Sequence, residues 1–207
     1  MSSPTPYDEL RYPGKFYPQA APSRIATVAA LFGLRPPALA TSRILELGCG
    51  EGGHLVPIAA AIPEARCLGI DASASAIERA RDYAERAGVE HCAFRAEDVR
   101  AFPEDAGPFD YILVHGVYSW VSEAAQQAIL SICARHLAPE GLAYISYNAY
   151  PGGHVRQILR DLTVFHTKDI ADPAEKVREA RQVCEFIVGA MPPNTLERQL
   201  FGRLLGA

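Results

Sequence analysis

The chain has 207 residues, of which 49% are hydrophobic and 21% are charged, and its formal net charge is −4. This length allows one full hydrophobic core and a small appendage, in an ordinary globular composition. The weakly acidic charge and the scattered Lys and Arg residues argue against a nucleic-acid surface, which needs a basic patch.

No apolar run approaches the ~20 residues of a membrane span, and residues 1–7 lack the apolar core of a signal peptide. The five cysteines form no C-x-x-C pair, and an odd number favours reduced thiols over a disulfide framework. The histidines show no ligand spacing, so we expect no metal. The sequence therefore predicts a cytoplasmic protein without a membrane segment, and it leaves the oligomeric state open.

Residues 1–22 combine five prolines with the aromatic residues Tyr7, Tyr12, Phe16 and Tyr17. This density of proline excludes a regular helix. A disordered tail is one interpretation, but disordered segments are poor in aromatic residues. An arm or lid that packs on the domain is the alternative. Residues 23–34 then show helical periodicity, with Ser23 as the expected N-cap.

From Arg43 the chain alternates between short apolar runs and amphipathic segments. We expect helices at 55–62, 75–88 and 122–137, the second opened by a capping box of Ser75 and Glu78. The expected strands are 43–47, 66–70, 92–95, 111–115 and 142–146. Such alternation predicts a doubly wound, mainly parallel α/β sheet with helices on both faces. No sixth or seventh strand is evident, so strand 142–146 is expected to lie unpaired at an edge.

Three further helices are expected at 154–166, 173–191 and 196–205. The predicted organisation is an N-terminal arm or lid at 1–22, a ligand-binding domain at 23–168, and a helical extension or the start of a second domain at 169–207.

Gly48, Gly50 and Gly53 have the spacing G-x-G-x-x-G between the first strand and the first helix of this alternation. Strand, glycine turn and helix present backbone N–H groups to a nucleotide-like ligand. The spacing alone fits a dinucleotide as well as other nucleotide-like ligands.

Acidic residues follow the first three strands, at the edge where open α/β sheets bind ligands. Asp71 is placed to accept hydrogen bonds from ribose hydroxyls, with a helix N-cap as the alternative. Asp98 is placed to meet a base amino group, with a solvated turn carboxylate as the alternative. Glu46 would repel a pyrophosphate but attract a cationic amine, and S-adenosylmethionine has such an amine, a ribose and an adenine.

The strings Glu46–Gly53, Gly69–Ser73 and Ala96–Val99 resemble the first three motifs of class I S-adenosylmethionine-dependent methyltransferases, and Phe109–Ile112 resembles the start of their fourth strand. The resemblance implies S-adenosylmethionine as the cofactor. The cofactor contacts that we expect on this basis are Glu46, Gly48, Cys49, Gly50, Gly52, Gly53, Asp71, Ala72, Glu97, Asp98, Val99 and His115.

Three further strings, Tyr17–Gln19, His115–Val121 and Ser146–Gly152, resemble a bacterial subgroup in which a methyltransferase regulatory domain follows the catalytic domain. Some members methylate protein lysines, and the resemblance adds Tyr17 and Gln19 to the expected cofactor contacts. The chain departs from the subgroup where Ala20-Ala21 replaces Thr-His and where Gly153 replaces Trp. Such proteins usually continue for hundreds of residues, so this chain is either a short paralogue or a piece of a longer protein.

Methyl transfer depends mainly on proximity and orientation, and a base is needed only when the acceptor must lose a proton. His115 is the candidate base and Tyr118 an orienting group, with core packing or a cofactor contact as the alternative for His115. The expected substrate contacts are Tyr118, Trp120, Tyr147 and Asn148. No Asn-Pro-Pro-Tyr string follows the fourth strand, so DNA is not the expected substrate.

The predicted function is thus methyl transfer to a small molecule or a protein side chain. A non-catalytic or truncated binding module and an NAD(P)-dependent oxidoreductase are the alternatives.

Overall fold

The computed structural model describes residues 14–206, so Tyr7 and Tyr12 of the predicted arm lie outside the described residues. The chain divides into two compact units, with Tyr147 ending the first and Asn148 beginning the second. This division precedes the boundary expected at 168/169, because helix α6 (Gly153–His166) packs against α7 (Pro173–Ala190).

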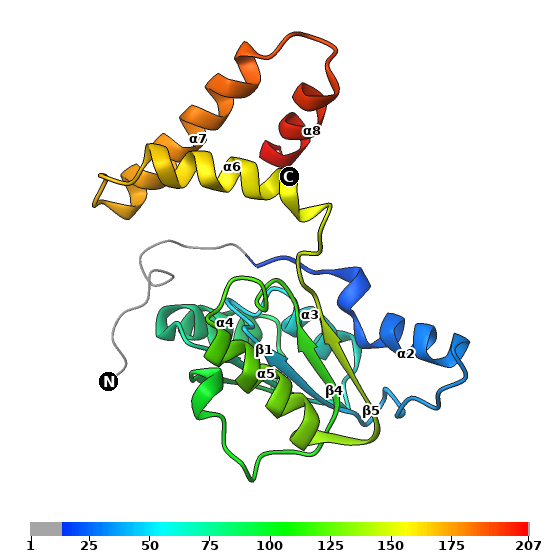
Figure 1. Ribbon diagram of the computed structural model, residues 1–207. Coiled ribbons are helices and arrows are strands. Elements are labelled where there is room, and N and C mark those ends of the chain that lie inside the picture. The colour runs from blue at the N-terminus through cyan, green and yellow to red at the C-terminus, as the bar shows by residue number, and fades with distance from the viewer. Residues whose placement is uncertain (1–13, 207) are drawn as a thin grey trace. The chain divides into compact units, whose positions relative to one another are not determined.

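The first unit contains a five-stranded sheet in the order β3-β2-β1-β4-β5, with every neighbouring pair parallel (Figure 1). The doubly wound α/β prediction is therefore confirmed, and the sheet is wholly parallel. β5 pairs only with β4 among residues 14–206, which places it at an edge as expected. The strands are β1 (Arg43–Leu47), β2 (Arg66–Asp71), β3 (Cys92–Ala96), β4 (Phe109–Val114) and β5 (Leu137–Ile145).

Alternate side chains of the central strands enter two separate cores, one on each face of the sheet. Ile44 and Tyr111 pack with side chains of α3 (Leu55–Ala61) and α4 (Ala74–Arg86). Leu45 and Ile112 pack instead with side chains of α5 (Glu123–His136). Burial on both faces explains why β1 and β4 are almost continuously apolar in sequence.

The helix starts differ from two expectations. Ser73, not Ser75, caps α4, because its hydroxyl accepts a hydrogen bond from the N–H of Ala76 at 3.1 Å. Helix α2 (Pro22–Leu31) begins with the proline and has no side-chain cap, so Ser23 is not its N-cap. Proline suits this position because the first helical N–H groups have no intrahelical partner. Short 3₁₀ turns, η1 (Pro18–Ala20) and η2 (Val99–Ala101), precede α2 and follow β3.

The second unit consists of α6, α7 and α8 (Leu196–Leu205), close to the three predicted helices. Asp172 caps α7 by accepting a hydrogen bond from the N–H of Ala174 at 2.8 Å. The buried side chains here are Leu159, Thr167 and Cys184, a thin core for three helices.

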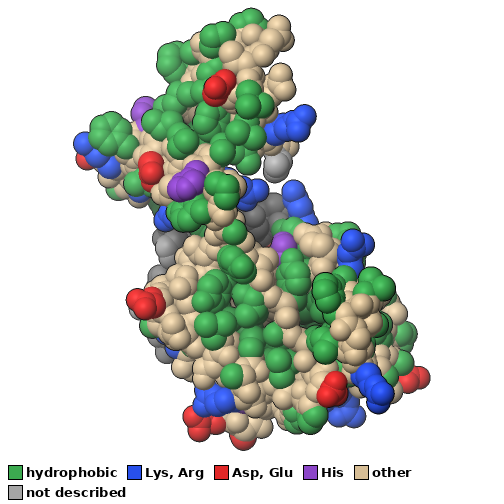
Figure 2. Space-filling view, turned by 45° about the vertical axis from the view of Figure 1, so that its right-hand side comes forward, with side chains coloured by type: hydrophobic (Ala, Val, Ile, Leu, Met, Phe, Trp, Pro, Cys, Tyr) green, Lys and Arg blue, Asp and Glu red, His purple; other side chains and the backbone are tan. Residues whose placement is uncertain are grey.

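The surface carries exposed apolar side chains (Figure 2), and Leu31 and Phe32 at the end of α2 are each 82% exposed. Within residues 14–206, none of the helices combines the length and apolar character that crossing a membrane requires. All five cysteines are buried free thiols: Cys49, Cys67, Cys92, Cys133 and Cys184.

Candidate functional site

The carboxyl ends of β1, β2 and β4 carry the residues that the sequence placed at a ligand site. Strand order changes direction on the two sides of β1, since β2 and β3 lie on one side and β4 and β5 on the other. In open α/β sheets, ligands bind beside this switch point. Glu46 lies near the end of β1, Asp71 ends β2 and His115 follows β4.

The glycine turn after β1 uses left-handed backbone conformations. Gly48, Gly50 and Gly52 have φ values of +74°, +52° and +76°. The N–H of Gly48 donates to the carbonyl of Ile70 at 2.8 Å, which holds the turn against β2. A Cβ at Gly48 would lie 2.4 Å from Cγ2 of Val117, whereas one at Gly50 would meet no atom of residues 14–206 within 4 Å. The turn is therefore closely packed at Gly48 and open at Gly50.

Asp71 holds the turn through both carboxylate oxygens. Oδ2 accepts a hydrogen bond from the N–H of Gly50 and Oδ1 accepts one from the N–H of Ser73, each at 2.9 Å. Because Ser73 is the cap of α4, Asp71 does not have the alternative N-cap role. A carboxylate has about four acceptor positions, so ribose hydroxyls can still bind these oxygens.

Glu46 is a buried carboxyl group, 3% exposed, whose Oε2 has no hydrogen-bond partner among residues 14–206. Burial, with smaller contributions from Cys67 and Asp71, raises the pKa of Glu46 well above its usual value. A buried acceptor without a partner costs free energy, and a ligand ammonium group would remove that cost. The residues present thus fit the amine of S-adenosylmethionine.

Asp98 is held by Arg100, whose Nη2 lies 2.6 Å from Oδ2 and whose Nε lies 2.9 Å from Oδ1. The Arg100 guanidinium holds the pKa of Asp98 below its usual value. Asp98 also caps η2, which matches the turn-carboxylate alternative, and a base amino group would share its oxygens with Arg100. The neighbouring Glu97 donates its N–H to the carbonyl of Asp71 at 2.8 Å. Ala72 is exposed, and Val99 packs against the α5 core.

His115 lies close to two tyrosine rings. Its ring centroid is 4.0 Å from that of Tyr17 and 6.0 Å from that of Tyr144. The Tyr144 hydroxyl is 3.5 Å from Nδ1. Burial lowers the pKa of His115, so its ring is neutral at pH 7 and able to accept a proton. Tyr17, from the predicted arm, is thereby brought to the end of β4.

The arm is bound by His54, a residue outside the set of site residues predicted from the sequence. The Tyr17 N–H donates to Nδ1 of His54 at 3.2 Å, and Nε2 of His54 lies 3.4 Å from the Ala20 carbonyl oxygen. The feature of the sequence that could have identified His54 is its position directly after the last glycine of the turn. Glu51, also missed, forms a 2.7 Å ion pair with Arg79 that links the turn to α4. Gln19 is exposed in η1.

The predicted substrate contacts are more dispersed. Tyr118 is partly buried against the α5 core, and its carbonyl accepts a hydrogen bond from Nε2 of Gln126 at 2.8 Å. Trp120 and Tyr147 are 50% and 67% exposed, on the segments that follow β4 and β5. Asn148 begins the second unit and is not assigned to the site.

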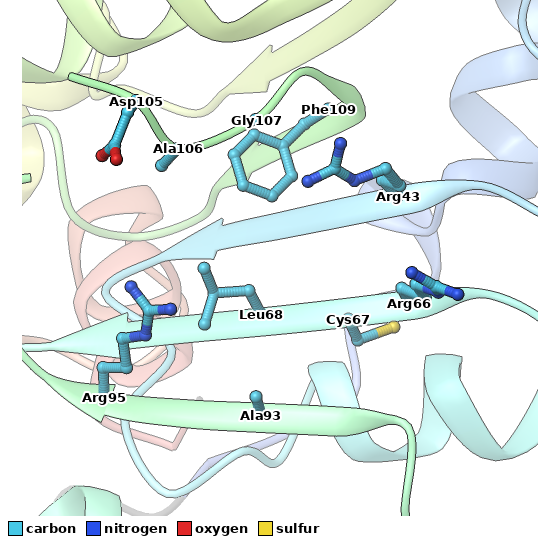
Figure 3. Close-up of a pocket in the computed structure, with 10 residues that line it drawn as sticks. All are labelled: Arg43, Arg66, Cys67, Leu68, Ala93, Arg95, Asp105, Ala106, Gly107 and Phe109. Carbon is cyan, nitrogen blue, oxygen red and sulfur yellow. The ribbon is translucent and has the colours of Figure 1, made fainter. Parts of the chain in front are cut away.

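A cavity of about 310 Å³ lies elsewhere, largely at the amino ends of the strands (Figure 3). Arg43 and Arg66 are the first residues of β1 and β2, and the Arg43 guanidinium carbon lies 5.4 Å from the centre of the Phe109 ring. None of the predicted site residues lines this cavity. Within the described part of the chain, no cluster of His, Cys, Asp and Glu side chains is arranged to hold a metal ion.

The chain resembles known proteins in sequence and in structure. A protein-family model described as a methyltransferase domain matches residues 44–141. The uncharacterized protein RP028 of Rickettsia prowazekii is 35% identical over 189 residues, which cover 91% of this chain and 76% of RP028. PKMT2 from Rickettsia typhi, solved in complex with AdoHcy, is 32% identical with a TM-score of 0.81, covering 95% of this chain.

The relatives differ in length. The chain spans 38% of the PKMT2 chain and 33% of RP789, another uncharacterized Rickettsia prowazekii protein that is 35% identical over 182 residues. The matched residues 44–141 contain the glycine turn, Asp71 and His115, and the likeness to PKMT2 includes most of the described chain. The chain belongs to the class I S-adenosylmethionine-dependent methyltransferases.

Proposed function

We propose that the first unit transfers the methyl group of S-adenosylmethionine to a protein side-chain amine, with lysine as the acceptor. The choice of lysine as the acceptor rests on the 32% identity and the TM-score of 0.81 with PKMT2, by name a protein-lysine methyltransferase. The exposed rings of Trp120 and Tyr147 support it, because aromatic faces attract ammonium groups.

Each polar group at the switch point receives one part of the cofactor in this proposal. Glu46 binds the amine, because its buried Oε2 has no hydrogen-bond partner in the described part of the chain. Asp71 receives the ribose hydroxyls on the acceptor positions that Gly50 and Ser73 leave free. The open space at Gly50 admits the ligand close to the backbone. Asp98, beside Arg100, borders the base.

Transfer of the methyl group to lysine requires that the acceptor nitrogen is unprotonated. Bound S-adenosylmethionine supplies an electrophilic methyl group on a sulfonium sulfur. His115 is neutral at pH 7 and takes the proton that a lysine ammonium group loses before its lone pair attacks. The Tyr17 ring lies against His115 at a tilt of 41°, with the ring centroids 4.0 Å apart, and covers one side of it. Tyr118 orients the acceptor, and Trp120 and Tyr147 hold its ammonium form before deprotonation.

The acceptor class is tested with S-adenosylmethionine carrying a labelled methyl group. Bacterial protein extract is offered in two forms, untreated and with its lysines blocked by acetylation. We expect label in the untreated protein and its loss after blocking. Label that persists on the blocked protein, or that enters only small molecules, would overturn lysine as the acceptor.

A substitution at the exposed ring tests substrate binding. Trp120→Ala should raise KM for the protein acceptor by about tenfold, which corresponds to one cation–π contact. Trp120→Phe should restore most of the loss, because an aromatic face remains. Phe32→Ala is the matched control, since Phe32 is an exposed aromatic residue directly after α2. An unchanged KM in Trp120→Ala would remove this residue from the proposed substrate surface.

A further inference from the structure

His54 directly precedes α3 and is 3% exposed, yet it has no capping bond to its own helix. Both of its ring nitrogens face the backbone of the arm instead. Nδ1 is 3.2 Å from the N–H nitrogen of Tyr17, and Nε2 is 3.4 Å from the carbonyl oxygen of Ala20. One imidazole ring therefore bridges the two ends of a four-residue stretch of the arm.

Only one form of the ring satisfies both partners. The Tyr17 partner is an N–H donor, so Nδ1 must carry a lone pair, and the proton must sit on Nε2, where it donates to the Ala20 carbonyl. In a doubly protonated ring, Nδ1 would carry a hydrogen and could no longer accept the hydrogen bond from the Tyr17 N–H. Burial, together with the nearby His115, lowers the pKa of His54 to about 4, which keeps the required neutral form near neutral pH.

The arm also lies directly on the glycine turn. A Cβ at Gly53 would lie 2.5 Å from the carbonyl carbon of Gly14, so only glycine permits this approach. The Phe16 ring packs on His54 with centroids 5.4 Å apart. In Figure 1 this segment, in blue, leads to α2 past the arrowhead end of the sheet.

We propose that His54 is a positioning residue that fixes residues 14–21 over the cofactor site, holds Tyr17 against His115 and slows release of the cofactor. Ala20 and Ala21 have no side-chain hydrogen-bonding group, so the bond from His54 reaches Ala20 through its backbone carbonyl. The inference rests on the proposed cofactor position at the glycine turn. It adds that the last residues of that turn, Gly53 and His54, bind the arm rather than the cofactor.

Three substitutions separate the two bonds from the packing of the ring. His54→Asn keeps an acceptor at the distance of Nδ1 for the Tyr17 N–H. His54→Gln keeps a donor near the position of Nε2 for the Ala20 carbonyl. His54→Phe keeps a ring of similar size against Phe16 but removes both bonds. Circular dichroism and melting temperature establish that each variant is folded.

The readouts are hydrogen exchange of residues 14–21 and the dissociation rate of S-adenosylhomocysteine in stopped flow. His54→Phe should lose protection of the Tyr17 amide and release the ligand about tenfold faster or more, the worth of one or two hydrogen bonds. His54→Asn should recover most of both effects, and association rates should change little. A folded His54→Phe variant with wild-type exchange and dissociation would overturn the proposal.

Gly53→Ala provides a second route, because it leaves His54 in place and displaces the arm sterically. It should show the same faster dissociation and the same loss of arm protection. Gly189→Ala is the matched control, because Gly189 is a helical glycine whose added Cβ would have no other described residue within 4 Å outside its own helix backbone. If the wild-type chain binds no S-adenosylhomocysteine, the proposed function fails and so does the role in cofactor release. The hydrogen-exchange comparison then still decides whether His54 holds the arm.

Discussion

Replacing Glu46 with Gln separates the charge of this buried group from its volume. The free protein contains a carboxyl group that is 3% exposed and whose Oε2 has no partner among the described residues. Its raised pKa means that the folded chain retains a proton that the unfolded chain releases. Gln is neutral and nearly isosteric, so it resembles the protonated state and cannot form an ion pair with the cofactor amine.

Glu46→Gln should change both the affinity for the cofactor and the dependence of stability on pH. A hydrogen bond to a charged partner is worth about 1.5–3 kcal/mol, so Glu46→Gln should weaken S-adenosylmethionine binding by about 10- to 150-fold. Because the folded pKa is raised above 4.5, the contribution of Glu46 to stability is complete below that pH and declines as the pH rises. The decline is at most about 1.4 kcal/mol per pH unit, and Glu46→Gln should remove it.

Calorimetry between pH 5 and 8, in buffers of different ionisation enthalpy, measures affinity and proton release together. The wild-type chain should release up to one proton on binding, since the cofactor amine favours the ionised carboxylate, and the variant should lack this release. Glu78→Gln, at an exposed position of α4, is the matched control. Wild-type affinity that does not change with pH, together with a variant that binds within twofold, would refute the assignment of Glu46 to the amine.

Three further predictions concern stability, measured by urea unfolding. Gly48→Ala should lower the free energy of unfolding by about 2–3 kcal/mol, because of the 2.4 Å approach to Val117 and a φ of +74°. Gly88→Ala, with a φ of +67° and open space, should lose only about 1 kcal/mol, and equal losses would exclude the steric effect. Because the pKa of His54 is lowered to about 4, stability should fall by about 3 kcal/mol as the pH drops from 6.5 to 4. His54→Phe should lack this fall, and retention of the full fall would assign it to other groups, such as His115. Tyr111→Phe should lose about 1–2 kcal/mol with its 2.6 Å bond to a backbone carbonyl, and a wild-type value would show that water replaces the hydroxyl.

The sheet could be predicted from the sequence because its strands are buried on both faces and read as continuous apolar runs. The start of β5 could not be predicted from the sequence. Pro139, Glu140 and Gly141 indicate a turn, so the strand was expected from 142. In the structure β5 begins at Leu137, which pairs with Phe109, and Glu140 adopts a φ of +65° within the strand. Pairing with β4, at an irregular register, overrides the local turn preference.

Only the part of the site that lies at the ends of strands could be predicted from the sequence. Glu46 and Asp71 lie where the parallel strands end, which sequence periodicity locates. The bond between Asp98 and Arg100 depends on side-chain rotamers, although the two residues are close in sequence. The contact between Tyr17 and His54 joins residues 37 positions apart, and no periodic pattern in the sequence relates these two positions.

The reactivity of the five buried cysteines can be used to measure local unfolding of the chain. A thiol reacts as the thiolate, and burial raises the pKa of Cys49, Cys133 and Cys184, so labelling in the native state is suppressed. Reagent therefore reaches each thiol only when its surroundings open, and the labelling rate gives the free energy of that opening. Cys49 reports on the glycine turn, Cys133 on α5 and Cys184 on the helical unit. Single-cysteine variants would measure how independently the two units unfold, without any added chromophore.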